Sequence, residues 1–364
     1  MSIFSVPCVT VQTVEKHPNA DSLDIITFNE IGWTCIDKLG KRSIGEKVVY
    51  VPVDSLVPVN RPEFEFLVKD ARLNGMARIK TIKLRQIFSQ GLIVDAPENA
   101  EVGEDYADHF GIIKYEPPEE GQMNSPRGGK NWPAWAEKSD AERYQNVIRI
   151  LEPLKDMKWY ATMKMDGTSA SYMIDFLEDE ENQRIICSRN LDITKNETSF
   201  YHEVEKKYNI FGRMLVNFKY CTTNMLYESI NGILDDYGKI EKLVLQGEIC
   251  GPGIQKNRMG LTEKKFYAFD IYIVSEKYVG FIDYDKFIRF LWMCDIETVP
   301  RLFIDKLPSL EEGLKISNEL KYPNDHPAEG VVYVACPTIN NIRGLGRAKV
   351  KILSQVYDLK INKD

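Results

Sequence analysis

The chain has 364 residues, of which 43% are hydrophobic and 28% charged, and its formal net charge is −7. This length accommodates about two or three domains that each bury a core, and the sequence lacks the run of about 18 apolar residues that predicts a transmembrane helix. The acidic balance disfavours a protein that coats nucleic acid non-specifically, so any nucleic-acid surface is expected to be local.

The seven cysteines are dispersed singly, without the Cys-x-x-Cys spacing or the clustered histidines that indicate structural zinc. The N-terminus also lacks the basic and apolar regions of a secretory signal. Both features favour reduced thiols in a cytoplasmic compartment. We therefore expect a cytoplasmic protein, and we expect it to be a monomer.

Residues 1–115 are predicted to form short strands separated by turns. Alternating or β-branched patterns occur in VPCVTVQTVEKH (6–17), SLDIITFNEIGWTCI (22–36), GEKVVYVPV (45–53) and IKLRQIFSQGLIV (82–94). Strands at this spacing suggest a small closed barrel. An OB-fold is the preferred interpretation because such barrels commonly bind oligonucleotides. The segment EKHPNADSLDI (15–25) also resembles tRNA-binding OB modules.

Four positive charges, Arg78, Lys80, Lys83 and Arg85, lie within eight residues of this region. On strands they would form a cationic stripe that suits a phosphate backbone. The alternative is a solvated strand face, since lysines also protect exposed sheet edges. Phe88 would either stack on a base or pack in the core.

Residues 116–131, EPPEEGQMNSPRGGKN, combine prolines, glycines and mixed charge with almost no apolar content, which predicts a linker. A second domain is expected over 132–364, with longer strands and several helices. Ser309 and Glu312 form a plausible capping box at the start of one of them. The predicted helices cover 138–154, 198–210, 222–235 and 309–320.

Lys164 stands out in ATMKMDGTSASYMIDF (161–176), where alternating apolar residues lead into an Asp-Gly pair. This pattern places an amine at the end of a strand in a tight turn, and Gly167 allows the backbone to approach a ligand closely. A lysine nucleophile must first lose a proton that it ordinarily holds up to a pKa of about 10.4. A surface turn lysine is the alternative interpretation.

Five blocks together carry a family resemblance: KMDGTS (164–169), LVLQGEICGPGIQKN (243–257), KKFYAFDIYIV (264–274), AEGVVYV (328–334) and GRAKVKIL (346–353). They resemble, in order, the motifs of the covalent nucleotidyltransferases, and GEICGPGIQK resembles RNA ligases in particular. RIKTIKLRQIFSQGLIV (78–94) is similar to the N-terminal OB domain of RNA ligases of the Naegleria and Deinococcus type. The resemblance implies an α+β fold, in which an OB-like barrel precedes an ATP-grasp-like nucleotidyltransferase domain of antiparallel sheets and helices.

The activity implied by the resemblance is ATP-dependent RNA ligation. Lys164 would attack the α-phosphorus of ATP and retain AMP through a phosphoramidate bond. The AMP would then pass to an RNA 5′-phosphate, and an RNA 3′-hydroxyl would displace it, a reaction expected in RNA repair. ATP and Mg²⁺ or Mn²⁺ are the implied cofactors, and RNA with 5′-phosphate and 3′-OH ends is the implied partner.

Two other interpretations stay open. A DNA ligase or an mRNA capping guanylyltransferase shares the motif order, but these enzymes carry an OB domain after the fifth motif, and only 13 residues (364 − 351) follow Lys351. A non-catalytic RNA-binding protein on a ligase scaffold is the third interpretation. The residues that bind pyrophosphate stay unassigned in all of them.

The resemblance also implies roles for individual acidic and aromatic residues. Glu248 would accept a hydrogen bond from a ribose hydroxyl. Glu329 would hold a divalent metal, which needs few protein carboxylates because Mg²⁺ keeps several waters. Asp166 would join the outer shell of that metal. Phe269 would stack on adenine, with Phe266 and Tyr267 as competitors. Taken singly, such residues are more often satisfied polar groups or core aromatics.

Basic residues complete the implied site. Lys349 and Lys351 alternate along a strand, so they point to one face and would clamp a phosphate. Arg143 is a candidate for the outer phosphates of the nucleotide, although a helix-surface arginine is the alternative. Arg189, in the accessory block SRN, would bind a ribose hydroxyl or a phosphate. Met163, which precedes the lysine, is expected to contact the nucleotide.

Overall fold

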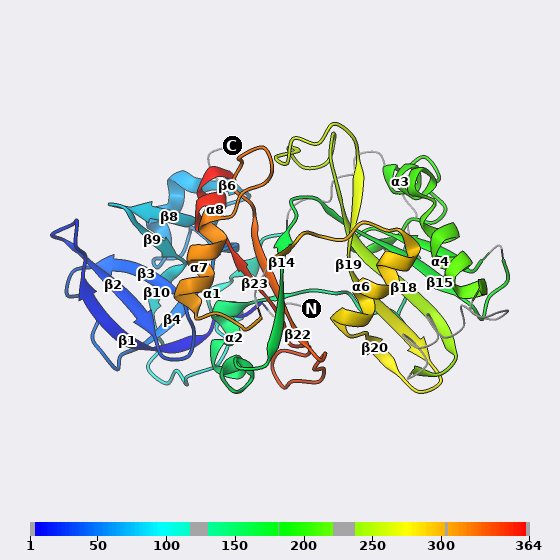
Figure 1. Cartoon of the computed structure of the whole chain (residues 1–364). Coiled ribbons are helices and arrows are strands. Elements are labelled where there is room, and N and C mark those ends of the chain that lie inside the picture. Colours follow the sequence, from blue (N-terminus) through cyan, green and yellow to red (C-terminus); the bar gives the residue numbers. More distant parts are fainter. Residues whose placement is uncertain (1–3, 117–129, 181, 221–236, 303–304, 362–364) are drawn as a thin grey trace.

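The computed structural model describes residues 4–116, 130–180, 182–220, 237–302 and 305–361. An N-terminal barrel lies at one end of the molecule, a large antiparallel sheet lies at the other, and a smaller sheet lies between them (Figure 1). The helix predicted over 222–235 falls outside the described residues. Within the described ranges, no helix has the length and apolar character needed to cross a membrane.

The N-terminal region is a nearly closed five-stranded antiparallel barrel of the OB type, as the sequence predicted. Its core includes Phe28, Trp33 and Tyr50, with the rings of Trp33 and Tyr50 stacked 6.0 Å apart. A second, four-stranded sheet packs its own apolar cluster against this barrel. The barrel strands, in sheet order, are β10 (Leu92–Asp95), β4 (Lys47–Val51), β1 (Cys8–Lys16), β2 (Leu23–Phe28) and β3 (Thr34–Lys38). The second sheet contains β11 (Ile113–Lys114), β5 (Ser55–Pro58), β7 (Met76–Arg78) and β6 (Ala71–Leu73), accompanied by helices η1 (Glu65–Asp70) and α1 (Ala107–Phe110).

The strand-like pattern over 82–94 does not form one continuous strand. The chain instead forms a hairpin of β8 (Thr81–Leu84) and β9 (Ile87–Gln90) before it enters β10. The two turn residues, Arg85 and Gln86, have φ angles of 43° and 77°. Two-residue hairpin turns with positive φ at both positions usually contain Asn-Gly or Asp-Gly, so Arg-Gln gives no sequence signal for this turn.

The helix predicted over 138–154 begins later than expected. Glu142–Arg143 forms β13, which pairs in parallel with β23 (Lys349–Leu353), and helix α2 covers only Tyr144–Leu151 before the short turn η2 (Glu152–Leu154). The preceding residues are held in another way, because the amide of Ser139 donates to the Gln246 side chain at 2.8 Å. This contact with a distant strand keeps the first part of the segment out of the helix.

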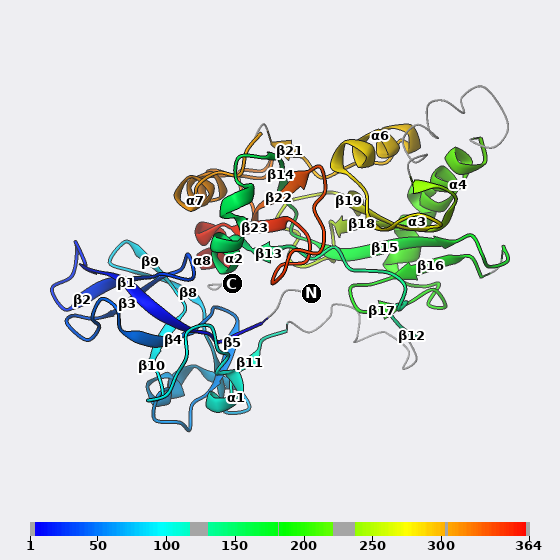
Figure 2. The ribbon, with the colours of Figure 1, turned by 90° about the horizontal axis from the view of Figure 1, so that it is seen from below.

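Two sheets build the rest of the molecule. Helices α3, α4 and α6 contribute to the core of the larger sheet, and helices α2 and α7 contribute to the core of the smaller one (Figure 2). The larger sheet orders β12 (Lys130–Asn131), β17 (Leu191–Asp192), β16 (Arg184–Cys187), β15 (Thr168–Asp175), β18 (Ile240–Cys250), β19 (Lys265–Ser275) and β20 (Val279–Phe281). The smaller sheet orders β13, β23, β22 (Gly330–Cys336), β14 (Lys158–Lys164) and β21 (Arg301–Leu302).

The helices are α3 (Phe200–Tyr208), α4 (Ile210–Tyr220), α6 (Tyr284–Cys294), α7 (Leu310–Glu319) and α8 (Gln355–Ile361). The prediction of a helix over 198–210 is confirmed by α3, and that over 309–320 by α7. The Ser309 side chain accepts from the Glu312 amide, and the Glu312 side chain accepts from the Ser309 amide, so the predicted capping box is present.

The turn between β14 and β15 carries the chain from the smaller sheet to the larger one. Lys164 pairs with Gly330 at the end of β14, and Thr168 pairs with Ile249 at the start of β15. A Cβ atom on Gly167 would lie 2.4 Å from the Ile249 carbonyl oxygen, so only glycine fits. The nucleophile candidate therefore lies where the edges of the two sheets meet.

The barrel contacts the rest of the molecule through α2 and α8. The indole of Trp33 donates to Asn146 at 2.7 Å, and the Gly32 amide donates to the Gln145 carbonyl at 2.8 Å. On the other side of the interface, the Thr81 hydroxyl donates to Asp358 at 3.0 Å. These contacts place β8 and β9 beside α8, close to the smaller sheet (Figures 1 and 2).

Candidate active site

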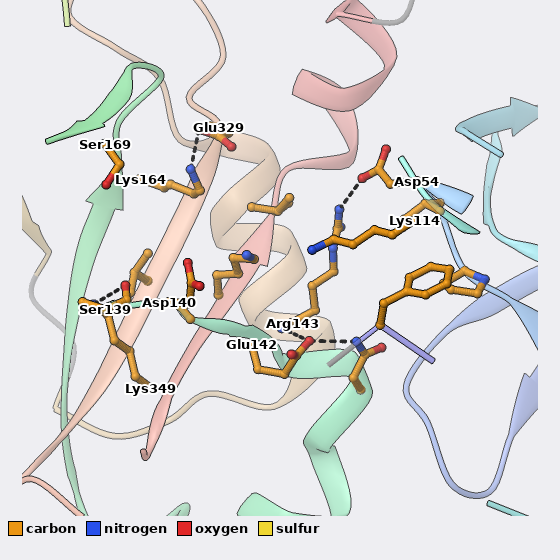
Figure 3. Close-up of a pocket in the computed structure, with 18 of the residues that line it drawn as sticks. Asp54, Lys114, Ser139, Asp140, Glu142, Arg143, Lys164, Ser169, Glu329 and Lys349 are labelled. Atoms are coloured by element: carbon orange, nitrogen blue, oxygen red, sulfur yellow. Dashed lines mark hydrogen bonds and ion pairs between the residues drawn. The ribbon is translucent and has the colours of Figure 1, made fainter. Parts of the chain in front are cut away.

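Lys164 lines a cavity of about 1400 Å³ that is bounded by the barrel and by both sheets. Its Nζ atom lies 2.7 Å from Oε2 of Glu329, and the two side chains are 26% and 20% exposed (Figure 3). Desolvation lowers the pKa of the lysine, but the charges of Glu329 and Glu248 outweigh this effect and hold it above its ordinary value. The amine is therefore protonated in this state and needs help to become a nucleophile.

Glu248 approaches the same region from the larger sheet. It lies in β18 opposite Ser169 of β15, and both residues line the cavity. Burial raises the pKa of Glu248 to about 7, the Lys164 ammonium opposes the rise, and Glu329 adds to it. With this pKa, the carboxyl group is present in both its protonated and its ionised form near neutral pH. It can therefore donate or accept a hydrogen bond, which suits contact with a sugar hydroxyl.

Asp166 lies in the turn after Lys164, and its side chain is 8% exposed. Its Oδ2 atom accepts from Nη1 of Arg258 at 3.0 Å. The guanidinium of Arg258 also lies 5.7 Å from the ring centroid of Tyr357 in α8. We did not predict Arg258 from the sequence, although it directly follows the GEICGPGIQKN block.

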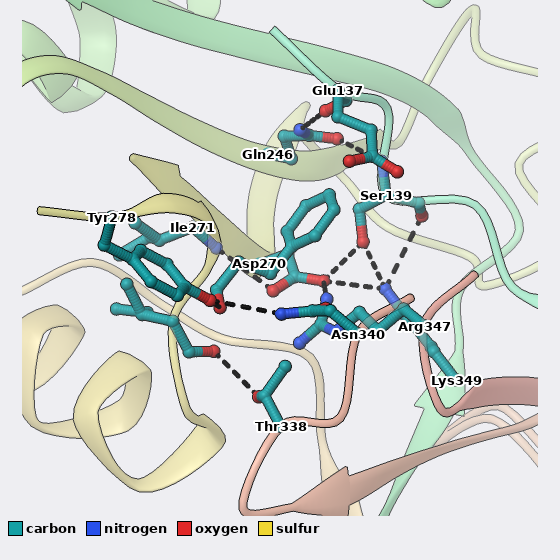
Figure 4. Close-up of polar contacts among 12 residues, drawn as sticks. Glu137, Ser139, Gln246, Asp270, Ile271, Tyr278, Thr338, Asn340, Arg347 and Lys349 are labelled. Atoms are coloured by element: carbon teal, nitrogen blue, oxygen red, sulfur yellow. Dashed lines mark hydrogen bonds and ion pairs between the residues drawn. The ribbon is translucent and has the colours of Figure 1, made fainter. Parts of the chain in front are cut away.

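Lys349 and Lys351 both lie in β23 and line the cavity, as their alternation suggested. Lys349 is buried and pairs with Asp270 at 3.0 Å, while Arg347 pairs with the same carboxylate at 2.5 Å (Figure 4). Ser139 also hydrogen-bonds both Lys349 and Asp270. Burial opposes ionisation of Asp270, but the two cations hold its pKa below the ordinary value.

Lys351 is the less restrained of the two lysines. Within the described residues it is in no ion pair. The pKa of Lys351 is lowered to about 8, mainly by burial and also by the positive charges of Lys164 and Arg143. A phosphate group placed among these cations would reverse that effect, since it would stabilise the charged form of each amine.

Of the three aromatic candidates, only Phe269 lines the cavity, together with Met163. Phe266 packs edge-on against Tyr172 in the core of the larger sheet. Tyr267 is also buried, in a cluster with Met165 and Cys250. The Phe269 ring lies 5.0 Å from Nζ of Lys349, so an aromatic face and a cation occupy one side of the cavity.

Arg143 approaches the cavity from β13 and not from a helix surface. Its Nη2 atom donates to Asp54 of the barrel at 3.2 Å, and Arg78 donates to the same carboxylate at 2.6 Å. Among the described residues, Nη1 of Arg143 is buried without a hydrogen-bond partner. Lys114, in β11 of the second N-terminal sheet, extends toward the same part of the cavity (Figure 3), and sequence reasoning did not identify it.

Arg189 lies at the rim of the cavity. Its side chain is 61% exposed and lies 3.6 Å from Asp140. Solvent screens such a pair strongly, so the guanidinium is available to another anion. The structure thus brings Arg189 to the cavity that holds Lys164, although it forms none of the close contacts of the buried lysines.

The predicted cationic stripe is divided in the structure. Arg78 lies in β7 and faces Asp54, whereas Lys80, Lys83 and Arg85 are exposed on or beside the β8–β9 hairpin. Nζ of Lys83 lies 5.1 Å from the ring centroid of Phe88. Phe88 is partly buried, and the three exposed cations form the remaining basic surface.

The described residues contain no cluster of three or more His, Cys, Asp or Glu side chains that would hold a metal by itself. A divalent cation that takes most of its ligands from water and phosphate oxygens needs only one or two carboxylates. Glu329 fits that requirement, because it is a hard oxygen donor that lines the cavity beside Lys164. The residues present thus fit Mg²⁺ or Mn²⁺ bound together with a nucleotide.

Comparisons with known proteins identify the family of the chain. A family model described as RNA ligase matches residues 157–351, which is more than half of the chain, and a model described as an OB-fold domain matches residues 6–96. No curated protein matches the chain.

The solved structures similar to the chain include those of Naegleria gruberi RNA ligase. The complex with pyrophosphate has a TM-score of 0.79 at 24% identity and covers 100% of both chains. A lysine-to-alanine mutant with ATP and Mn has a TM-score of 0.80 at 23% identity and covers 99% of this chain and 100% of that one. At 23–24% identity, the match to solved structures shows the fold alone. The match to the RNA ligase family model shows which family the chain belongs to. The chain belongs to the RNA ligase family.

Proposed function

We propose that this protein joins RNA 3′-OH and 5′-phosphate ends through a covalent lysyl-AMP and an adenylylated RNA 5′ end, as a step in RNA repair. The observation that carries the proposal is the position of Lys164. Its amine lies at the meeting point of two sheets, within 2.7 Å of Glu329, in a cavity that Lys349 and Lys351 also line. An amine, a carboxylate and two further cations at one point suit transfer of a nucleotidyl group.

In the first step, deprotonated Nζ of Lys164 would attack the α-phosphorus of ATP. The new P–N bond would form as the bond to the bridging oxygen breaks, pyrophosphate would leave with the electron pair, and the nitrogen would release its extra proton to solvent. A divalent cation held by Glu329 would neutralise charge on the α-phosphate and lower the pKa of the lysine. The protein then contributes mainly alignment and charge stabilisation, as in other phosphoryl transfers.

We assign the nucleoside to the side of the cavity formed by the larger sheet. Phe269 would stack on adenine, and Glu248, with its pKa near neutrality, would bind a ribose hydroxyl. Met163 would contact the nucleotide, and Arg189 would bind the ribose or a phosphate at the rim. Lys349 and Lys351 would hold the α-phosphate, whose charge would compete with Asp270 for Lys349.

The outer phosphates would bind toward the barrel. Arg143 has one buried nitrogen without a partner in the described part of the chain, and Lys114 extends toward the same space (Figure 3). An unsatisfied buried guanidinium nitrogen is costly, and a phosphate oxygen would satisfy it. These two residues are our candidates for the pyrophosphate contacts that the sequence left unassigned.

RNA would dock on the basic hairpin surface, formed by Lys80, Lys83 and Arg85. These side chains are exposed, and the hairpin carrying two of them packs beside α8, whose Tyr357 contacts Arg258 next to the catalytic turn. The separation of residues 1–115 and 132–364 into an RNA-docking and an adenylylation domain, joined by 116–131, belongs to the same proposal.

The direct test is incubation of the purified protein with ATP or GTP radiolabelled at the α-phosphate. We expect label on the protein from ATP that is stable to alkali and released by acid, as a phosphoramidate requires, and sealing of nicked duplexes that carry RNA at the break. Label from GTP alone would indicate a capping guanylyltransferase, and sealing confined to DNA would indicate a DNA ligase. Absence of any adduct would support a non-catalytic RNA-binding protein and overturn the proposal.

A further inference from the structure

A short loop between α7 and β22, residues 321–327, contacts the backbone of Lys164. We call it the Tyr322 loop. Tyr322 is 2% exposed, and its hydroxyl donates to the carbonyl oxygen of Lys164 at 3.0 Å. The same hydroxyl accepts from the amide of Glu329 at 3.2 Å. One oxygen atom thus joins the backbones of the two residues whose side chains form the ion pair.

These bonds lie where the ladder between β14 and β22 ends. Lys164 and Gly330 are its last pair, and Glu329 lies one residue beyond it. Beyond this pair the β14–β22 ladder no longer joins the two strands, although the Ser354 amide still donates to the Glu329 carbonyl at 2.9 Å. Without the Tyr322 hydroxyl, a carbonyl and an amide in a buried region would each lose a hydrogen bond, and the separation of the two strand ends would be less restrained.

The Tyr322 loop also restrains the other side of the catalytic turn. Asn324 donates to the backbone carbonyl of Arg258 at 2.8 Å, and the guanidinium of Arg258 holds Asp166 at 3.0 Å. The loop is itself closed by the bond from the Tyr322 amide to the His326 carbonyl at 2.8 Å. Both ends of the segment from Lys164 to Asp166 are thus fixed by one loop.

We propose that Tyr322 is a positioning residue for lysine adenylylation, an inference that rests on the function proposed above. Tyr322 does not touch the reacting atoms. Its hydroxyl sets the relative position of the Lys164 and Glu329 backbones, and thereby aims the amine at the α-phosphorus. Misplacement of a nucleophile by about 1 Å costs up to roughly 100-fold in rate, so the loss of this bridge has a measurable kinetic effect.

The test compares Tyr322→Phe with Tyr172→Phe in single-turnover adenylylation with labelled ATP. Tyr172 is a matched control, because it is fully buried and its hydroxyl donates to the Tyr201 carbonyl at 3.0 Å without lining the cavity. Both the rate of adduct formation and its final amount per protein are measured. A purely structural defect lowers the final amount, whereas a positioning defect lowers the rate of the molecules that do react.

We expect Tyr322→Phe to slow adduct formation by roughly 10- to 100-fold with an almost unchanged final amount, and Tyr172→Phe to keep the wild-type rate. A wild-type rate for Tyr322→Phe, or an equal slowing in both variants, would overturn the inference. If Tyr322→Phe does not fold, Asn324→Ala, at an exposed position, is expected to slow the rate to a smaller extent, and an unaltered rate there counts against the inference. Failure of the wild-type protein to form an adduct contradicts the proposed function instead.

Discussion

The two sides of the cavity are organised in different ways. On the side of the two sheets, buried ion pairs between distant strands fix the basic groups, as in the contact of Asp270 with Lys349 and Arg347. On the barrel side, Asp54 holds Arg78 and Arg143 near the interface of two regions of the chain. The ion pairs on the sheet side are almost fully buried, whereas those of Asp54 are partly exposed, so solvent screens the Asp54 pairs more strongly. The predictions below test this division.

The largest effect is expected for Lys164→Ala, which removes the proposed nucleophile from the sheet side. Adduct formation should fall below detection, because the proposed P–N bond is made by this amine. The measurement is transfer of label from α-labelled ATP to the protein. The melting temperature should stay near that of the wild type, since the lysine side chain is partly exposed. A surviving adduct would place the nucleophile at another residue.

Arg143→Ala should reduce the rate of adduct formation by roughly 100-fold, because it removes a charged donor from the outer phosphates of ATP. Arg149→Ala is the matched control. It lies on the adjoining helix and also contacts the barrel, through a bond to the Asn29 carbonyl at 2.8 Å, but it does not line the cavity. If both variants lose the same fraction of the adduct-formation rate, the effect comes from weaker contact with the barrel and not from a lost contact with ATP.

The combined change Lys83→Ala and Arg85→Ala should weaken sealing of nicked RNA by roughly tenfold and leave adduct formation unchanged. The salt dependence of RNA binding should also decrease, by a slope of about 1 for each lost phosphate contact. Lys41→Ala, which removes an exposed barrel lysine paired with Asp37, is the control. Loss of adduct formation in the double variant would contradict an RNA-docking role for the basic hairpin surface.

The smallest effect concerns pH. Because the pKa of Lys351 is lowered to about 8, its ammonium loses its proton as the pH rises through that value, and its attraction for phosphate falls. The KM for ATP should therefore increase several-fold between about pH 7 and pH 9. Lys351→Arg keeps its charge over this range, so its KM should change less. Parallel profiles for the two proteins would exclude Lys351 as the titrating group.

The five sequence blocks located the sheet side of the cavity well. Lys164, Glu248 and Phe269, together with Lys349 and Lys351, line one cavity although more than 180 residues separate the first from the last. The blocks carry this information because each combines a strand pattern with residues whose place within the motif the resemblance identifies: Lys164 ends β14, whereas Glu248, Phe269 and Lys351 lie inside strands. The roles assigned to these residues stay predictions until the variants are measured.

The remaining contacts depend on tertiary structure that local patterns do not encode. The Arg85–Gln86 turn lacks the residues that usually mark a tight hairpin, and the late start of α2 follows from the contact of Ser139 with Gln246. Tyr322 resembles any core aromatic until its hydroxyl is seen between two strand ends. The role of such a residue can be recognised only in the tertiary structure, where segments distant in the sequence lie side by side.

The carboxylate of Asp54, shared by two arginines, has a consequence for turnover. If Arg143 transfers to the triphosphate, the barrel loses one of its tethers to the larger part of the molecule just when the nucleotide is bound. Departure of pyrophosphate would then restore that tether. Binding and release of the nucleotide would thus loosen and restore one contact between the N-terminal region and the rest of the protein in each cycle.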